Sequence, residues 1–115
     1  DNKFSLRKNG KFYFAGQMTG VEGYVESAAS GLMAGLHAAR AALELPEIEF
    51  SNLTAHGALA NYISNSEVKN FQPMNVNFGL IAPLGRKIRN KREKNAMIAQ
   101  RALEEIARIK EQYNI

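Results

Sequence analysis

The sequence predicts an α+β fold that is mostly helical and carries one short β-hairpin near its N-terminus. Two short aromatic-rich runs flank a turn sequence at the start of the chain, and later stretches show the apolar spacing of helices. With 115 residues, 45% of them hydrophobic and 23% charged, the chain has the composition of a globular protein with one core. We expect residues 1–45 to form a hairpin, a glycine-rich turn and a buried helix, and residues 46–115 to form a helical C-terminal region.

The predicted hairpin pairs the runs Phe4–Leu6 and Lys11–Phe14 across Arg7-Lys8-Asn9-Gly10. Asn-Gly readily takes the positive φ angles of a type I′ turn, so the chain is expected to reverse at Asn9-Gly10. The second strand should end at Ala15-Gly16.

The first long helix is expected from Tyr24 to about Leu43, a stretch without proline that is rich in Ala, Leu, Met and Gly. Small residues occupy several of its faces, which predicts a helix buried on more than one side. Gly31 and Gly35 would each cost about 1 kcal/mol relative to Ala in an exposed helix, so they favour close approach of another backbone or a ligand. Pro46 marks the exit from this segment.

A second helix is expected from His56 to about Ile63, with Thr54 as its N-cap, followed by a loop at residues 64–66. Residues 70–83 are too apolar to float in solvent but are interrupted by two prolines, which predicts an ordered connection against the core. The last helix should run from about Lys91 to Tyr113. Its predicted apolar face consists of Ala99, Ala102, Leu103, Ile106, Ile109 and Tyr113.

The net charge of +4 is unevenly distributed along the chain. Residues 1–85 carry six Lys/Arg and seven Asp/Glu, whereas residues 86–115 carry nine and four. Two interpretations remain open for the basic segment 86–94: contact with a polyanion, or solvated charge at the start of a helix. The candidate residues for contact with nucleic-acid phosphates are Arg86, Lys87, Arg89, Lys91, Arg92 and Lys94.

The composition excludes several kinds of site. Cysteine is absent, so the segment holds no disulfide, no thiolate metal site and no nucleophilic cysteine. His37 and His56 lack metal-ligand spacing, and we expect no metal site. No apolar run approaches the roughly 20 residues that span a bilayer, and the start lacks the layout of a signal peptide, so we expect no membrane contact and a cytoplasmic location.

Three glycines stand where the hairpin should pass into the first helix. Gly16, Gly20 and Gly23 precede a helix whose first turn leaves backbone N–H groups unpaired, and this predicts a place where an anion or an electron-rich ring edge is stabilised. The spacing is not that of a dinucleotide-binding fingerprint. From the spacing alone, an ordinary tight strand-to-helix turn remains the alternative.

The amino-acid sequences of three segments are more specific than the glycine spacing. The segment Ala-Gly-Gln-Met-Thr-Gly-Val-Glu-Gly-Tyr-Val-Glu-Ser-Ala-Ala-Ser-Gly at 15–31 resembles the C-terminal flavin motif of the folate-dependent tRNA (uracil-5-)-methyltransferases, the TrmFO family. Thr-Ala-His-Gly-Ala-Leu at 54–59 and Asn-Phe-Gln-Pro-Met-Asn-Val-Asn-Phe-Gly-Leu at 70–80 resemble further motifs of that family, in the same order. A related flavoprotein that modifies the wobble uridine shares the Ala-Gly-Gln start and the alanine-rich helix, whereas Val-Glu-Gly-Tyr-Val-Glu-Ser and Phe-Gln-Pro-Met-Asn favour the first family.

The resemblance implies part of an FAD-binding, Rossmann-like flavoprotein in which residues 1–45 complete the FAD-binding domain. In that family, reduced flavin transfers a one-carbon unit from methylenetetrahydrofolate to carbon 5 of a T-loop uridine in tRNA, with NAD(P)H as the reductant. The dinucleotide fingerprint and the catalytic cysteine of the family are missing here, so the chain is interpreted as a fragment. We expect no catalytic residue in it and no activity by itself.

The resemblance also assigns candidate site residues. The cofactor-binding candidates are Gly16, Gln17, Thr19, Gly20, Val21, Gly23 and Tyr24. Backbone N–H groups near Gly20 and Val21 would hydrogen-bond the pyrimidine edge of the flavin. Tyr24 and Glu26 either position the ligand or favour the helix dipole. Three residues of the third motif either line a flavin or folate pocket or pin the loop to the core: Asn75, Asn77 and Phe78.

Two other functions remain as alternatives. One is a fragment of the wobble-uridine-modifying relative, and the other is a basic RNA-binding module without enzymatic activity, for which no RRM, KH or OB signature is present. Self-association of the truncated fragment is also expected if truncation exposes apolar surface. His56 is interpreted as a local hydrogen-bonding residue at the start of a helix rather than as an acid or base.

Overall fold

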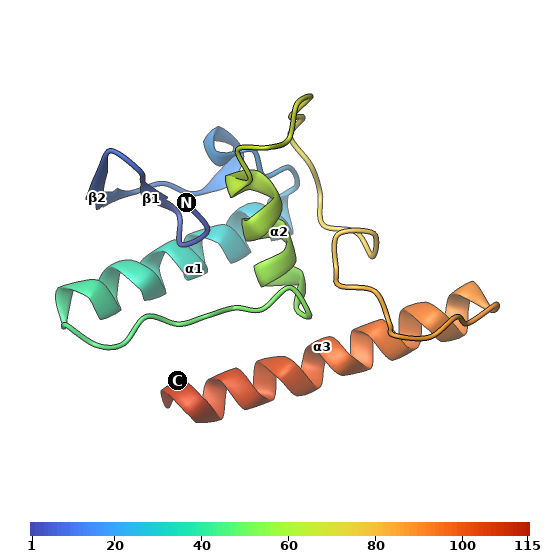
Figure 1. The fold of residues 1–115 in the computed structure, drawn as a ribbon. Helices are drawn as coiled ribbons and strands as arrows, with labels where there is room; N and C mark the ends of the chain where they lie inside the picture. Colours follow the sequence, from blue (N-terminus) through green and yellow to red (C-terminus); the bar gives the residue numbers. More distant parts are fainter.

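The computed structural model describes all 115 residues and contains three helices and one two-stranded sheet, as predicted (Figure 1). Strands β1 and β2 are followed by the 3-10 helix η1 and the helices α1, α2 and α3. Their bounds are Ser5–Leu6 (β1), Asn9–Tyr13 (β2), Gly16–Thr19 (η1), Tyr24–Ala42 (α1), Ala55–Ser64 (α2) and Lys91–Tyr113 (α3). No helix is both long enough and apolar enough to cross a membrane.

The hairpin forms, but its turn lies two residues earlier than predicted. Ser5 pairs with Tyr13 and Leu6 with Asn9, so the chain reverses at Arg7-Lys8, with an irregular register between the two pairs. None of these turn residues has a positive φ angle, and neither does Gly10. The Asn9 side chain instead accepts a hydrogen bond from the Lys11 amide at 3.1 Å, which holds Asn9 in the strand.

Helix α1 is buried on one side only, contrary to the prediction of several buried faces. Ser30, Met33, Ala34 and His37 face the core. The opposite face is exposed, and a Cβ added at Gly31 or Gly35 would meet no atom within 4 Å. Within this chain no backbone approaches these glycines, so their predicted role in close packing is not fulfilled here. The exposed small residues of that face are Ala28, Gly31, Gly35 and Ala39.

Two hydrophobic clusters meet at helix α2. The first joins the hairpin, the glycine turn, α1 and α2 through Phe4, Val21, Met33, Ala34, Leu59 and Ala60. The second joins α2 to α3 through Ala58, Ile81 and Ile98. The Thr54 hydroxyl accepts a hydrogen bond from the Gly57 amide at 3.0 Å, which confirms the predicted N-cap. Because consecutive residues of α2 face different neighbours, this short helix connects both halves of the chain.

Helix α3 begins and ends where predicted and is capped by Asn90, whose side chain accepts from the Glu93 amide at 3.1 Å. Fewer of its residues are buried against the rest of the molecule than the predicted apolar face contains. Ile98 and Ile109 are buried, but Leu103 is 67% exposed. The extended segment between α1 and α2 runs along α3 (Figure 1), where Ser51 donates to Glu105 and the Glu49 amide donates to the Tyr113 hydroxyl.

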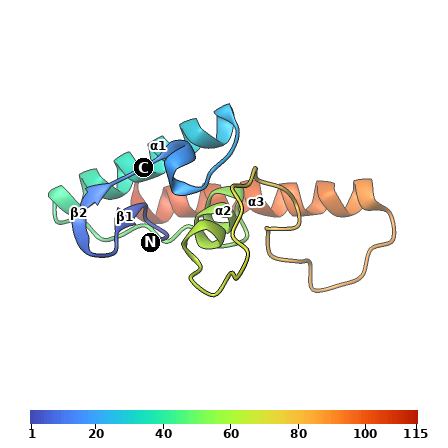
Figure 2. The same cartoon turned by 90° about the horizontal axis from the view of Figure 1, so that it is seen from above.

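Residues 70–83 contact the core at Val76, Leu80 and Ile81, as predicted, although they form no helix or strand. The part of the connection that follows loops outward before α3 (Figure 2). Met74 makes an isolated parallel bridge with Val21. Farther along, the Ala82 amide donates to the Asn52 carbonyl at 2.8 Å, and Arg101 of α3 donates to the carbonyls of Ala82 and Pro83. These bonds attach the connection to three separate parts of the chain.

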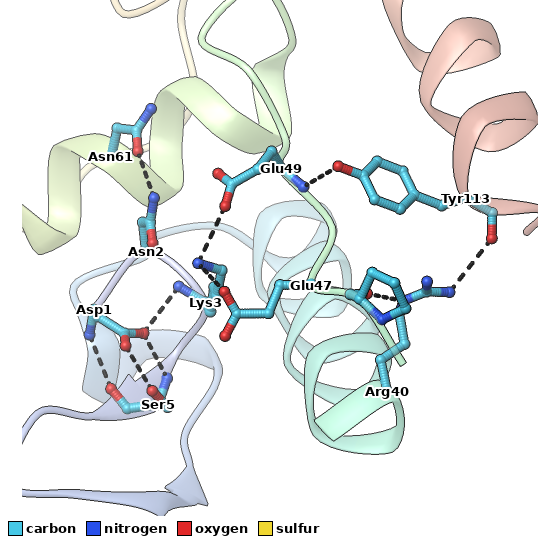
Figure 3. A network of polar contacts seen from close by, with 10 residues as sticks. Asp1, Asn2, Lys3, Ser5, Arg40, Glu47, Glu49, Asn61 and Tyr113 are labelled. Carbon is cyan, nitrogen blue, oxygen red and sulfur yellow. Dashed lines mark hydrogen bonds and ion pairs between the residues drawn. The ribbon is translucent and has the colours of Figure 1, made fainter. Parts of the chain in front are cut away.

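A polar network joins the two ends of the chain through the segment after α1 (Figure 3). The Lys3 ammonium lies 2.8 Å from Glu47 and 3.3 Å from Glu49. These carboxylates raise the pKa of Lys3, with the Glu47 hydrogen bond as the main cause. Arg40 donates to the carbonyls of Pro46 and Tyr113, and the Tyr113 hydroxyl accepts from the Glu49 amide at 3.3 Å. The C-terminal end of α3 is thereby held against α1.

His37 makes the core sensitive to acid. Its ring packs edge-on against Phe50 with centroids 5.9 Å apart, and its Nε2 is buried without a hydrogen-bond partner. Burial lowers the pKa of His37, and the charge of Lys3 lowers it further. Burial also lowers the pKa of His56. Both rings therefore remain neutral in the folded chain at pH values where unfolded histidine takes up a proton.

We predict that the free energy of unfolding falls as the pH drops below about 6.5, the ordinary histidine pKa, because the unfolded chain then binds protons that the folded chain excludes. Above that pH both states are neutral at these rings and the effect vanishes. His37→Leu should reduce the slope of stability against pH, measured by urea unfolding between pH 7.5 and the lowered folded pKa. A variant with the wild-type slope would contradict the assignment to His37.

Candidate functional site

The glycine-rich segment forms a strand-to-helix turn, and each of its three glycines has a positive φ angle. The angles are 76° at Gly16, 95° at Gly20 and 97° at Gly23, in the region that favours glycine. Residues Gly16–Thr19 make one 3-10 turn, and the chain then passes through the bridge at Val21 into α1. The sequence prediction of a glycine-dependent turn at this place is therefore confirmed.

Ser30 holds the turn against α1 and was not among the predicted residues. It is 2% exposed, and its hydroxyl accepts from the Gly16 amide at 2.8 Å while donating to the Ser27 carbonyl at 2.7 Å. The Thr19 hydroxyl donates to the Gly16 carbonyl at 2.6 Å and closes the 3-10 turn. Ser30 lies 14 residues from Gly16, so nothing in the local sequence indicated this contact.

The third motif covers the turn. The ring of Phe71 lies where a Cβ on Gly20 would be, and it stacks on Tyr62 with centroids 5.6 Å apart. Asn75 donates to the Glu22 carbonyl at 3.0 Å and to the Glu26 carboxylate at 3.3 Å. The space beside Gly20 is thus filled by the Phe71 ring of the chain itself.

The first turn of α1 offers unpaired backbone donors. Its N-cap, Gly23, supplies no side-chain cap, and Ser27 is the first residue whose amide bonds within the helix. The preceding amides of Tyr24, Val25 and Glu26 find no acceptor in the chain. Such donors at the positive end of a helix stabilise an anion or a partial negative charge. These free donors lie a few residues after Gly20 in the chain.

Four of the predicted cofactor-binding residues differ in exposure and in the pairing of their backbone amides. The Gly20 amide is occupied by the Gln17 carbonyl at 3.0 Å, and the Val21 side chain is fully buried in the core. The Val21 amide has no acceptor in the chain, but it is buried with the rest of the residue and is not exposed at the surface. Tyr24 is 96% exposed and Gln17 is also exposed. The structure thus places backbone donors and the Tyr24 ring together at one surface.

Two clefts flank this surface. One of about 810 Å³ lies between the hairpin, η1 and the residues after α2, and Thr19 and Gly20 contribute to its wall. Arg7 and Lys8 also line it. The other, of about 220 Å³, lies between α1 and α2 and is lined by Glu26, Ser30 and His56 among mostly apolar side chains. Phe4 lines both clefts.

Other sequence candidates have structural roles. His56 lies in the first turn of α2 and stacks on Phe50 with centroids 6.0 Å apart. Asn77 accepts from the Gly79 amide at 2.9 Å, which stabilises a turn rather than the glycine segment. Phe78 lies in a separate cavity near the start of α3. No group of three metal-ligating side chains occurs among the described residues.

The basic segment is exposed and unneutralised. None of its six cations forms an ion pair, since the only pairs in the structure are those of Lys3 and Arg108. Lys91, Arg92 and Lys94 lie in the first turn of α3, where cations oppose the helix dipole. An anionic partner would remove this unfavourable interaction.

Comparison with known proteins identifies close relatives. Residues 1–46 match the family model "Glucose inhibited division protein A". Three proteins named methylenetetrahydrofolate–tRNA-(uracil-5-)-methyltransferase TrmFO are similar to most of the chain. The protein from Bacillus licheniformis is 57% identical over 106 residues, 92% of this chain and 24% of its own length. Those from Pelotomaculum thermopropionicum and Streptococcus agalactiae are 55% and 56% identical over 94% and 92% of this chain. The chain spans about a quarter of the length of these relatives.

Replacing Gly20 should disturb the turn through Phe71. We expect Gly20→Val to lower the free energy of unfolding by about 3 kcal/mol, because a β-branched residue at positive φ is strained and would displace the Phe71 ring. Gly10→Val is the matched control, since a Cβ there meets nothing within 4 Å and its φ is not positive. Urea unfolding of both variants tests this, and equal losses of stability would contradict the contact.

Proposed function

The chain belongs to the TrmFO family of methylenetetrahydrofolate–tRNA-(uracil-5-)-methyltransferases, and on that basis we propose that it supplies one wall of the flavin site of such an enzyme. The observation that carries the proposal is the uncapped start of α1, where free amides and the exposed Tyr24 ring lie together after the glycine turn. The complete protein would form 5-methyluridine in the T-loop of tRNA.

The donors at the start of α1 fit the pyrimidine edge of FAD. That edge presents carbonyl oxygens, and reduction adds negative charge to it, so backbone amides and the positive helix end would stabilise the reduced ring. The amides of Tyr24 and Val25 would hold the edge, and the Tyr24 ring would cover it. The bound flavin supplies the transfer of the one-carbon unit from methylenetetrahydrofolate, with NAD(P)H as the reductant.

The exposed face of α1 supports its place within a larger flavin domain. Between Glu26 and Arg40 the helix carries no Asp, Glu, Lys or Arg, yet only one of its sides is buried. Leu32 on the outer side is 61% exposed among small residues. In the proposed enzyme, this face contacts the remainder of the FAD-binding domain, which binds the pyrophosphate and carries the catalytic cysteine. Residues 1–45 are accordingly proposed to complete that domain.

The basic segment is proposed to contact tRNA. Six exposed cations within residues 86–94 lack acidic partners, and phosphates would neutralise them. The segment lies at the opposite end of the connection from the glycine turn, so flavin and tRNA backbone would contact different parts of the chain (Figure 1).

The 115-residue chain should bind FAD weakly and should be colourless when purified, because it offers donors for the ring edge and no pyrophosphate-binding fingerprint. Titration with FAD followed by flavin fluorescence measures this. Tight, stoichiometric binding of FAD would contradict the proposal that the chain forms only one wall of the flavin site. Analysis of tRNA treated with the complete protein would distinguish 5-methyluridine from a wobble modification or from binding without reaction.

Changing Lys91 and Arg92 to Gln in the complete protein should weaken tRNA binding and flatten its salt dependence. Each lost phosphate contact should lower the log–log salt slope by about 0.7 to 0.9, while flavin content stays unchanged. Lys110→Gln, an exposed cation in the last turn of the same helix, is the control. An unchanged salt slope in the double variant would mean that these charges only keep the surface of α3 solvated and do not contact tRNA.

A further inference from the structure

A cavity near the start of α3 combines aromatic, apolar and cationic walls. It has a volume of about 350 Å³ and lies between the turn at Phe78-Gly79 and the first turns of α3. Phe78, Ile88 and Ile98 supply its apolar surface, and Arg89, Lys91, Lys94 and Asn95 supply its polar surface. No acidic residue lines it. This volume is at the lower end of the range for small-ligand sites.

The apolar walls of the cavity are fixed by the core. Ile98 is 2% exposed and packs in the cluster with Ala58 and Ile81. Phe78 is 44% exposed, so its ring remains accessible. The turn that carries it is closed by the Leu80 amide, which donates to the Asn77 carbonyl at 3.1 Å. A flat ring entering the cavity would therefore meet a preorganised aromatic surface.

The charges of the cavity have no partner within the chain. Arg89, Lys91 and Lys94 form no ion pair. The Asn95 amide forms no side-chain hydrogen bond either, so it is free to contact the edge of a base. Asn90 already caps α3, so the attraction for an anion comes from the three cations rather than from free amides of the helix.

We infer that this cavity binds one unstacked nucleotide of a single-stranded RNA segment, with its base on Phe78 and its phosphates at Arg89, Lys91 and Lys94. Stacking on an aromatic side chain combined with cationic backbone contacts is how proteins bind single-stranded nucleic acid. A base held within a duplex cannot enter the cavity. The other three cations of the segment do not line the cavity, and a longer polyanion could contact them as well.

The inference deepens the proposed function, since it gives the tRNA contact a defined site. It also separates the six cations into two sets of equal charge. Arg89, Lys91 and Lys94 line the cavity, whereas Arg86, Lys87 and Arg92 do not. Both sets should contribute to salt-dependent attraction, but only the first should distinguish a single strand from a duplex.

The test measures binding of the complete protein to a short single-stranded RNA and to an RNA duplex of equal length, by fluorescence anisotropy at several salt concentrations. Phe78→Ala should weaken single-strand binding about tenfold and leave duplex binding and the salt slope unchanged. Phe12→Ala removes another exposed aromatic ring and should have no effect. Phe78→Leu keeps an apolar wall without a flat ring and should weaken single-strand binding in the same way. It replaces Phe78→Ala in the test if Phe78→Ala does not fold.

A second pair of variants removes two positive charges in each case. Lys91→Gln with Lys94→Gln should lower single-strand affinity more than Lys87→Gln with Arg92→Gln, although both should flatten the salt slope. Photocrosslinking of RNA that contains 5-iodouridine should modify Phe78 in the wild type, and uridine monophosphate should compete weakly.

The outcomes separate the inference from the proposed function. Wild-type single-strand affinity in the Phe78 variants, or equal losses for single strand and duplex, would overturn the nucleotide site while leaving the phosphate contacts in place. Strong competition by uridine monophosphate would overturn the choice of RNA over a free nucleotide. Binding with the expected Phe78 dependence, in a protein that forms no 5-methyluridine, would support the site and reject the proposed reaction. A wild type that binds neither RNA would reject both.

Discussion

The short parallel bridge between Val21 and Met74 is the contact on which the arrangement of the whole chain depends. The Met74 amide donates to the Gly20 carbonyl and the Glu22 amide donates to the Met74 carbonyl, each at 3.0 Å. The bridge joins segments more than 50 residues apart and directs the chain into α1. It also holds the connection that carries Phe71, Asn75 and Phe78. Since the Val21 side chain is fully buried beneath it, the bridge and the core support each other.

The glycines of the turn are explained by the chain's own packing. At Gly20 and Gly23 the positive φ angles allow the reversal, and the missing side chains leave room for Phe71 and Asn75. A ligand is therefore not required to account for either glycine. The uncapped amides at the start of α1 are different, because nothing in the chain satisfies them. The flavin proposal consequently depends on these amides and on Tyr24 rather than on the glycine spacing.

Charge and hydrophobicity are separated between the two long helices. Helix α1 has an uncharged outer face, whereas α3 begins in a cluster of unpaired cations. Helix α3 is joined to the rest by a narrow apolar strip, by the Arg101 bonds to residues 82–83 and by the network at Arg40 and Tyr113 (Figure 3). This arrangement leaves most of its surface available to solvent or to an anionic partner.

The sequence by itself determined the elements, since these depend on residues close together in the chain. The caps Thr54 and Asn90 bond amides three residues away, and the helix bounds followed from local patterns. Tertiary structure decided which faces are buried, where the hairpin turns, and what fills the space at Gly20. The exposure of Leu103 and the contact of Phe71 with Gly20 depend on segments that are distant in the sequence. No local sequence pattern predicts them. The amino-acid sequences of the motifs indicated the family, but only the structure distinguished paired backbone amides from free ones.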